Sequence, residues 1–400
     1  MMSAGGFSKS RLDRMHDVMS GYVERGEVPG IVTLVSRRGE VHVETIGMKK
    51  VGGSDPMRRD TIFRIASMTK PITAVAAMIL VEECKLRLDE PVDRLLPELS
   101  SRRVLKRLDS PLDDTEPASR AITLRDLLTF RLGIGAVMAP PGKYPIQKAM
   151  AEAGLAPGPN SLQITPDEYM RRLDSLPLIH QPGEKWMYHT GSDILGVLIA
   201  RAAGQPLENF FRERIFEPLR MKDTGFHVPS EKLGRLPNSY IINPETGELT
   251  VHDEPGDSKW GRPPVFPSGG GGLVSTADDY LAFCQMMLNK GRYGNDRILS
   301  RPSIELMTTD HLTPEQKADA HIFFGGNRGW GFGVSVATRR DDLAGVPGRF
   351  GWDGGIGTSG YTDPKEEMVG ILMTQRMMDS PNPPRVFLDF WTSVYQAIED

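Results

Sequence analysis

The sequence predicts an α/β (α+β) protein in which both ends of the chain form one antiparallel sheet and the middle is an inserted, mostly helical domain. Short strand-like segments bounded by turns occur before residue 67 and again near the C-terminus, and a helix-like segment lies at each chain end. The segments between them mostly have the apolar spacing and capping residues of helices. We therefore expect residues 1–66 and 260–400 to form an α/β domain and residues 67–259 a helical domain with long loops. The active site is expected at their interface.

The N-terminal elements are a helix, a hairpin and a strand that leads into an apolar helix. The hairpin turns at Arg37-Arg38-Gly39-Glu40. The expected ranges are 11–25 for the first helix, 31–36 and 41–46 for the hairpin, 61–66 for the strand and 71–81 for the apolar helix.

Capping residues predict the helices of the middle. Thr123 is a good N-cap, and Thr165 is followed three residues later by Glu168, as in a capping box. The expected helices are 124–131, one from 166 onward, 192–203 and 206–216. Residues 136–165 are dense in Pro, Gly and Ala and are expected to be a long loop, and residues 228–270, again dense in Pro and Gly, are expected to be loop or short strand.

The C-terminal part changes to strands joined by turns. Thr276 caps a last helix before them, which is expected to end at Leu288. The predicted strands are 329–337, 348–355, 359–363 and 368–374, and a final helix is expected at 384–400.

Bulk properties are those of an ordinary globular protein. The 400 residues carry a net charge of −4, which gives no indication of a nucleic-acid partner. Cys84 and Cys284 lie in apolar runs and are expected to be buried free thiols in a reducing compartment. The N-terminus resembles no signal peptide and no apolar run can span a bilayer, so we expect a cytoplasmic protein without a membrane partner. The oligomeric state is not indicated.

Ser67-Met68-Thr69-Lys70 is the segment that most clearly indicates chemistry. Residues three apart share a helix face, so the Ser67 hydroxyl and the Lys70 amine can meet. The apolar helix behind them would partly desolvate Lys70 and lower its proton affinity, which lets it act as a base. The Ser67 N–H at the helix start could stabilise an oxyanion. The alternative is that Ser67 is an ordinary helix N-cap.

Two further segments are candidates for the same site. Tyr188 lies between a Pro-Gly turn and a helix, and could transfer a proton if a neighbouring ammonium lowered its pKa; the alternative is a packing role. Residues 350–358 are rich in glycine, so the Gly355 N–H could reach a substrate carbonyl, unless the segment is only a bulged hairpin. The glycines at 269–272 match no nucleotide loop and are expected to line a crowded wall or form a turn.

Other common chemistries have little support. The eight histidines show no metal-ligand spacing, so no metal is expected. No G-x-S-x-G occurs, so a Ser-His-Asp esterase of the α/β-hydrolase type has little support. No cofactor is expected either. His189 is adjacent to Tyr188, but neighbouring side chains normally project in different directions. We therefore assign His189 a structural role.

Three elements occur in order, Ser67-x-x-Lys70, Tyr188-x-Thr190 and Trp352-Asp353-Gly354. Together they resemble the serine β-lactamase and penicillin-binding-protein superfamily, and more closely the family VIII carboxylesterases, which share the class C β-lactamase fold. Four longer segments carry the same resemblance, and they are 63–71, 88–92, 122–129 and 269–280.

The resemblance implies a β-lactamase-like fold and a role for each matched residue. Ser67 would be the acylated nucleophile, and Lys70 and Tyr188 would share the proton transfers. The N–H groups of Ser67 and Gly355 would form the oxyanion hole, and Trp352 would line the substrate pocket.

Departures from the superfamily pattern indicate the substrate. Thr190 stands where β-lactamases have an asparagine that offers its amide to substrate and lysine. Trp352-Asp353-Gly354 replaces Lys-Thr-Gly, so the lysine that would meet a substrate carboxylate is absent and Asp353 could repel one. Whether Arg349 restores a cation stays open. We expect small neutral esters as substrates.

Four functions compete. The first is a serine carboxylesterase for short to medium acyl esters, with weak β-lactam hydrolysis as a possible side activity. The second is an amidase, β-lactamase or D-amino-acid peptidase, and the third is an acyltransferase. The fourth, a binding or sensor protein, is disfavoured because Ser67, Lys70 and Tyr188 are all present.

Overall fold

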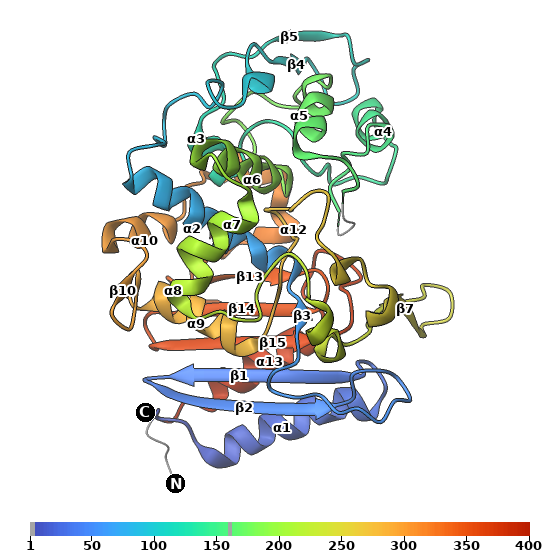
Figure 1. The fold of residues 1–400 in the computed structure, drawn as a ribbon, viewed down its shortest axis with the longest axis vertical. Helices are drawn as coiled ribbons and strands as arrows, with labels where there is room; N and C mark the ends of the chain where they lie inside the picture. The colour runs from blue at the N-terminus through green and yellow to red at the C-terminus, as the bar shows by residue number, and fades with distance from the viewer. Residues whose placement is uncertain (1–4, 159–161) are drawn as a thin grey trace.

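The computed structural model describes residues 5–158 and 162–400, and its main sheet is formed by both ends of the chain (Figure 1). Seven antiparallel strands lie in the order β11-β12-β13-β14-β15-β1-β2. Their bounds are β11 Arg328–Trp330, β12 Ser335–Ala337, β13 Phe350–Gly354, β14 Thr358–Asp363, β15 Met368–Thr374, β1 Gly30–Arg37 and β2 Glu40–Gly47. This confirms the predicted fold class.

Strand β1 joins the two ends, because it pairs with β2 on one side and with β15 on the other. Its successive side chains face opposite layers. Ile31 and Val35 pack with helices α1 (Lys9–Glu24) and α13 (Arg385–Gln396), whereas Val32 and Leu34 belong to the large core that contains α2 (Thr69–Glu82) and α9 (Ala277–Leu288). The sheet is therefore covered on both faces, which explains why every residue of β1 is buried.

The remaining helices of the described residues all follow α2 in the chain, and most of them lie between α2 and α9 (Figure 1). They are α3 Leu124–Leu128, α4 Pro145–Glu152, α5 Pro166–Asp174, α6 Thr190–Ala203, α7 Leu207–Phe211, α8 Glu217–Leu219, α10 Arg301–Met307, α11 Pro314–Lys317 and α12 His321–Phe324. Thr123, Thr165 and Thr276 cap α3, α5 and α9 through their hydroxyls, as predicted. The predicted domain boundaries after residues 66 and 259 stay a prediction.

Four two-stranded sheets complete the architecture. They are β3 (Phe63–Arg64) with β8 (Val274–Ser275), β4 (Arg103–Leu105) with β5 (Thr115–Pro117), β6 (Ser239–Ile242) with β7 (Leu249–Asp253), and β9 (Arg292–Tyr293) with β10 (Asp296–Arg297). The first of these pairs is the most important for the site, because β3 runs directly into the turn that carries Ser67.

Several expected elements differ from the observed ones. The loop predicted at 136–165 contains α4, whose Ile146 and Met150 are one turn apart and both buried; residues 159–161 of that loop lie outside the described part. The predicted strand at 329–337 is two strands, β11 and β12. Helix α3 ends at Leu128 rather than at residue 131, and the predicted helix 206–216 continues beyond α7 as a π-helical turn at Arg212–Phe216.

The two cysteines differ in burial. Cys284 is buried in α9, as predicted, but Cys84 is exposed, which corrects the expectation for that residue. Cys84 follows the last residues of α2 with φ 58°, so the chain turns away from the helix axis there and the apolar run no longer faces the core.

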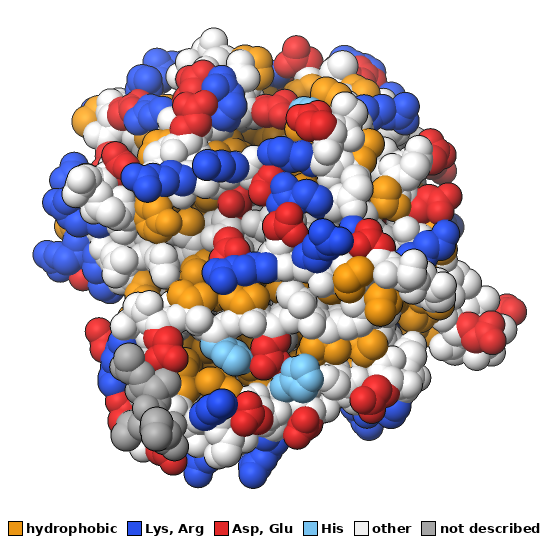
Figure 2. Space-filling model, turned by 60° about the horizontal axis from the view of Figure 1, so that its bottom comes forward, with side chains coloured by type: hydrophobic (Ala, Val, Ile, Leu, Met, Phe, Trp, Pro, Cys, Tyr) orange, Lys and Arg blue, Asp and Glu red, His pale blue; other side chains and the backbone are white. Residues whose placement is uncertain are grey.

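The surface carries charges of both signs. On the face drawn in Figure 2, basic and acidic side chains alternate and neither sign forms a continuous patch. Many charged side chains of the described surface form ion pairs, for example Arg59 with Asp278 and Arg125 with Asp89. Among the helices of the described residues, none has the length and apolar character needed to cross a bilayer.

Candidate active site

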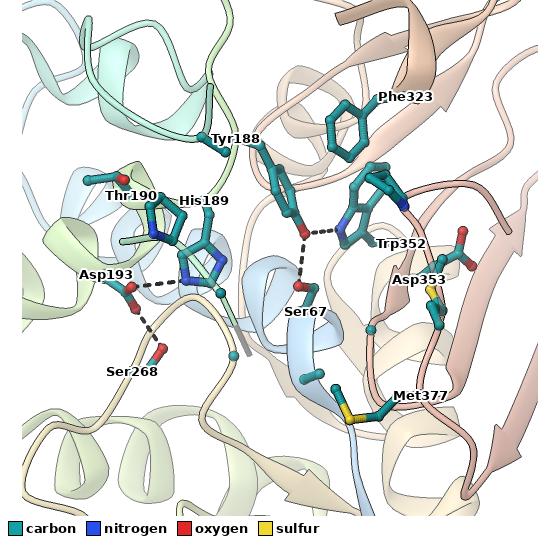
Figure 3. A pocket seen from close by; sticks show the side chains of 18 of the residues that line it. Ser67, Tyr188, His189, Thr190, Asp193, Ser268, Phe323, Trp352, Asp353 and Met377 are labelled. Atoms are coloured by element: carbon teal, nitrogen blue, oxygen red, sulfur yellow. Dashed lines mark hydrogen bonds and ion pairs between the residues drawn. The ribbon is translucent and has the colours of Figure 1, made fainter. Parts of the chain in front are cut away.

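A cavity of about 900 Å³ lies beside the end of β13 and the starts of α2 and α6. Ser67, Tyr188, Thr190, Trp352 and Gly355 all line it, although they are up to 288 positions apart in the sequence. The fold therefore brings most of the predicted site residues to one place (Figure 3).

Ser67 is positioned by a strained turn rather than by the α-helix itself. It is the middle residue of the 3₁₀ turn Ala66–Met68, and α2 begins only at Thr69. Ala66 has φ 44°, a left-handed conformation that residues other than glycine rarely adopt. Such strain is common where a scaffold fixes a functional side chain. The turn leaves the serine at the cavity wall.

Lys70 lies one turn further on and is completely buried. Its Nζ is 2.8 Å from Ser67 Oγ and donates to the carbonyl oxygen of Gly270 at 2.6 Å. Burial lowers the pKa of Lys70 to about 7, against the opposing effect of the Asp193 carboxylate. A substantial fraction of this side chain is therefore a neutral amine at neutral pH and can accept a proton from Ser67.

Tyr188 completes the group around the serine. Its hydroxyl donates to Ser67 Oγ at 2.8 Å and accepts from the Trp352 indole Nε1 at 2.7 Å. Burial raises the pKa of Tyr188, so the condition set in the sequence analysis, a pKa lowered by a neighbouring ammonium, is not met. Tyr188 is held in its protonated form and is suited to donate a proton rather than to remove one.

An aromatic wall supports Tyr188 and Trp352. The Tyr188 ring is 5.0 Å from Phe323 and 5.7 Å from both Trp186 and Trp352, measured between ring centroids. Phe323 lies in α12, far from the motifs in the sequence, and no local pattern indicated it. These rings fix the orientation of the phenol by packing on several sides (Figure 3).

Two backbone N–H groups point to an oxyanion site. Within residues 5–158 and 162–400, neither the Ser67 nor the Gly355 N–H donates a hydrogen bond to the chain. A Cβ built on Gly355 would meet nothing within 4 Å, so the cavity is open there. Gly354 does not line the cavity; it packs tightly against Ile65 and Thr358 and holds β13 close to the turn of Ser67.

Asp353 lines the cavity, whereas Arg349, whose role the sequence left open, does not. Strand alternation directs Trp352 toward Tyr188 and the Asp353 carboxylate the other way, where it accepts from Ser359 Oγ at 2.6 Å and Tyr361 OH at 3.1 Å (Figure 3). Burial raises the pKa of Asp353. The Arg349 guanidinium stacks between Tyr361 and Trp391, 4.0 Å from each ring centroid, and does not line the cavity.

His189 contacts the lysine, which the sequence analysis did not predict. Its Nδ1 is 3.2 Å from Lys70 Nζ, and its Nε2 is 3.1 Å from an Asp193 carboxylate oxygen. The structural role assigned to His189 assumed an ordinary backbone, but this residue has φ 87°. The spacing of His189 and Asp193, four residues apart at a helix start, is the signal that could have indicated the pair.

Thr190 is buried at the first position of α6 and lines the cavity. The described residues include no group of three or more His, Cys, Asp or Glu side chains that could hold a metal ion. The chemistry the site offers is that of a serine hydroxyl between an amine and a phenol.

Comparisons with known proteins agree with this arrangement. The family described as Beta-lactamase matches residues 15–387. The protein Rv1367c of Mycobacterium tuberculosis is 39% identical over 368 residues, which cover 89% of this chain and 88% of that protein. Esterase EstB of Burkholderia gladioli is 30% identical over 393 residues, which cover 94% of this chain and 92% of EstB.

A solved structure shows the same fold. It is described as EstCE1, a hydrolase with promiscuous acyltransferase activity, and it is 25% identical with a TM-score of 0.81, covering 97% of this chain and 99% of EstCE1. The resemblance inferred from the motifs is confirmed, as is the β-lactamase-like fold. The chain belongs to the beta-lactamase family, in which it is a relative of the esterase EstB.

Proposed function

We propose that this protein is a serine carboxylesterase that hydrolyses neutral esters of short to medium acyl chains through a Ser67 acyl-enzyme. One observation carries the proposal: Ser67 Oγ lies 2.8 Å from both Lys70 Nζ and Tyr188 OH at the wall of a large cavity. A nucleophile in contact with both a base and an acid has the proton-transfer groups that an acyl transfer needs.

The acylation step follows from the protonation states. Neutral Lys70 accepts the Ser67 proton while Oγ attacks the ester carbonyl carbon, and the carbonyl oxygen becomes an oxyanion between the Ser67 and Gly355 N–H groups. The C–O bond to the alcohol then breaks. Tyr188 donates its proton to the leaving alkoxide and regains one from the Lys70 ammonium. In deacylation a water molecule attacks the acyl-enzyme and the proton transfers run in reverse.

The proposed preference for neutral esters rests on what the pocket side chains do. Trp352 replaces a lysine and presents its indole N–H to Tyr188 rather than a cation to the substrate. The Arg349 guanidinium lies outside the cavity lining and supplies no substitute. Lys259 and Arg328 do line the cavity, but Asp193 and Asp353 line it as well and offset their charge.

The test is hydrolysis of p-nitrophenyl acetate, butyrate and octanoate beside nitrocefin, with wild type, Ser67→Ala and the exposed-site control Ser230→Ala. We expect fast ester turnover, weak nitrocefin turnover, an inactive Ser67→Ala and an unchanged Ser230→Ala. Strong nitrocefin turnover would favour a β-lactamase instead, and ester turnover that survives in Ser67→Ala would exclude the mechanism.

Acyl transfer to an alcohol is the second candidate. EstCE1 is described as having promiscuous acyltransferase activity, and the cavity of about 900 Å³ has room for an acceptor beside the acyl group. Adding butanol or a bulkier alcohol to the ester assay distinguishes the two functions. Transester products in excess of free acid would favour the acyltransferase.

A further inference from the structure

We propose that His189 is a positioning residue for Lys70. His189 Nδ1 and the Gly270 carbonyl oxygen each accept a hydrogen bond from one N–H group of the amine, and this directs the amine lone pair at Ser67. This inference rests on the proposed function, because it assigns Lys70 the role of base. It adds His189 and its partner Asp193 to the three side chains proposed to carry out the reaction, which are Ser67, Lys70 and Tyr188.

The first argument is a count of donors and acceptors at the amine. Lys70 Nζ has three polar neighbours, which are Ser67 Oγ at 2.8 Å, Gly270 O at 2.6 Å and His189 Nδ1 at 3.2 Å. A neutral amine has two N–H bonds and one lone pair. A carbonyl oxygen can only accept, so one N–H is directed at Gly270. If the lone pair is to receive the Ser67 proton, the other N–H must be directed at His189.

The second argument fixes the tautomer of the imidazole. Nδ1 can accept from Lys70 only if the ring proton is on Nε2. Nε2 is 3.1 Å from Asp193 Oδ2, and an ionised carboxylate only accepts hydrogen bonds, so the proton is on Nε2. The tautomer that Asp193 selects is therefore the one that Lys70 requires.

Asp193 is itself held in place. Its other oxygen accepts from Ser268 Oγ at 2.6 Å and from the Gly270 N–H at 3.0 Å. Burial raises the pKa of Asp193, but His189 and the hydrogen bonds from Ser268 and Gly270 lower it more, and the net pKa lies below its usual value. Gly270 thus contacts both Asp193 and Lys70. Its N–H orients the Asp193 carboxylate, and its carbonyl oxygen orients the Lys70 amine.

The third argument is the backbone at His189. Its dihedral angles are φ 87° and ψ −58°, a conformation that non-glycine residues rarely adopt and that persists only where the surroundings hold it. The turn lets two consecutive side chains act on the same serine, because Tyr188 contacts Ser67 directly while His189 reaches Lys70. An ordinary extended or helical backbone would direct them to different sides.

The test compares His189→Leu, which fills the space without a polar atom, with His189→Asn, whose Oδ1 can occupy the position of Nδ1. The readout is the rate at which a fluorophosphonate probe labels Ser67, measured by intact mass between pH 5 and pH 9. The titratable groups that face the amine are Tyr188, His189 and Asp193, and Asp193→Asn completes the set. His42→Leu, on the outer strand β2, is the matched control.

We expect His189→Leu to lower the plateau labelling rate by about 10-fold to 100-fold. We also expect the acid limb of its pH profile, the range in which the labelling rate rises with pH, to move to lower pH. The reason is that Lys70 loses a hydrogen-bond acceptor, so its ammonium form becomes less stable and its pKa falls. Asp193→Asn should move the limb in the same direction. His189→Asn should recover the rate to within a few-fold, and His42→Leu should behave as wild type.

Three results would overturn the inference. The first is a His189→Leu variant that is labelled as fast as wild type. The second is a rate loss with no shift of the limb and no recovery in His189→Asn, which would indicate packing alone. The third is disappearance of the limb in both His189 variants, which would assign the titration to the imidazole. Failure of the proposed function gives a different result, since wild type itself would then not be labelled at Ser67.

Discussion

At the scale of single residues, burial sets the chemistry of the site. Lys70 is buried and Tyr188 is half-buried at the cavity wall. Burial disfavours the charged form of each: it lowers the pKa of the amine and raises that of the phenol. The same physical effect therefore produces a neutral base and a protonated acid on either side of Ser67. Both Lys70 and Tyr188 are therefore uncharged before the reaction begins.

Tyr188→Phe should lower kcat/KM for p-nitrophenyl butyrate by about 100-fold to 10,000-fold, because it removes the proton donor to the leaving group. The ring stays in the aromatic wall, so the free energy of unfolding should fall by only about 1 kcal/mol for the lost hydrogen bonds. Steady-state kinetics and thermal unfolding measure the two effects. Tyr293→Phe, on β9, is the matched control, and equal losses of activity in both variants would contradict the assignment.

The activity of wild type should depend on pH through Lys70. The base must be neutral, so log kcat/KM should rise with unit slope up to a pH of about 7 and then level off. No alkaline limb is expected before pH 9, because the pKa of Tyr188 is raised and its proton is retained there. A bell-shaped profile with a descending limb near pH 8 would contradict this protonation scheme.

At the scale of elements, the glycines at 269–272 combine the two alternatives that the sequence left open: residues 269–271 form a turn, and the surroundings of Gly269, Gly270 and Gly272 are crowded. A Cβ on Gly270 would lie 3.0 Å from Asp193 Oδ1 and from the His189 ring, whereas a Cβ on Gly271 would only meet Ala66 at 3.8–4.0 Å. Adjacent positions in one loop thus differ sharply in the space around them. The loop can approach Lys70 closely only because Gly270 has no side chain.

Gly270→Ala should therefore impair the site more than Gly271→Ala. We expect a loss of kcat/KM of about 10-fold or more in Gly270→Ala, because a displacement of His189 or Asp193 alters the orientation of Lys70. The melting temperature of Gly270→Ala should fall. The free energy of unfolding of Gly271→Ala should stay within about 1 kcal/mol of the wild-type value. Thermal unfolding and ester kinetics on the pair test this, and equal melting temperatures would show that the loop relaxes freely.

At the scale of the whole molecule, the sheet separates the cavity from a second buried layer. Trp352 faces the cavity, while Asp353, Tyr361 and Arg349 lie together on the side of α13. Among the described residues, Nε and Nη2 of Arg349 have no hydrogen-bond partner, so this guanidinium is held mainly by the two aromatic rings. Its role is to stabilise the layer behind the site.

Arg349→Ala should lower the free energy of unfolding by about 2 kcal/mol or more, because it removes buried packing and leaves Asp353 with less compensation. We expect kcat/KM for a neutral ester to change by less than about three-fold. The exposed Arg340→Ala is the control. Chemical denaturation and kinetics measure both, and a large rise in KM confined to esters that carry a carboxylate would instead make Arg349 a substrate cation.

The sequence by itself determined the class of fold and the starts of several helices, and it predicted Ser67 as the candidate nucleophile. Strand periodicity at both chain ends predicts the shared sheet, threonine caps predict the starts of α3, α5 and α9, and Ser67-x-x-Lys70 places a serine and a lysine on one helical face. These features are local, since each depends on residues a few positions apart.

Only the tertiary structure decided which other groups surround the serine. His189 contacts Lys70 because of one rare backbone angle, Phe323 supports Tyr188 from a distant helix, and the Asp353 carboxylate accepts a hydrogen bond from Ser359. The pKa of Tyr188 rises rather than falls because burial outweighs the hydrogen bonds with Ser67 and Trp352, which lower it. Burial and long-range contact depend on how distant segments pack, and no local pattern in the chain encodes them.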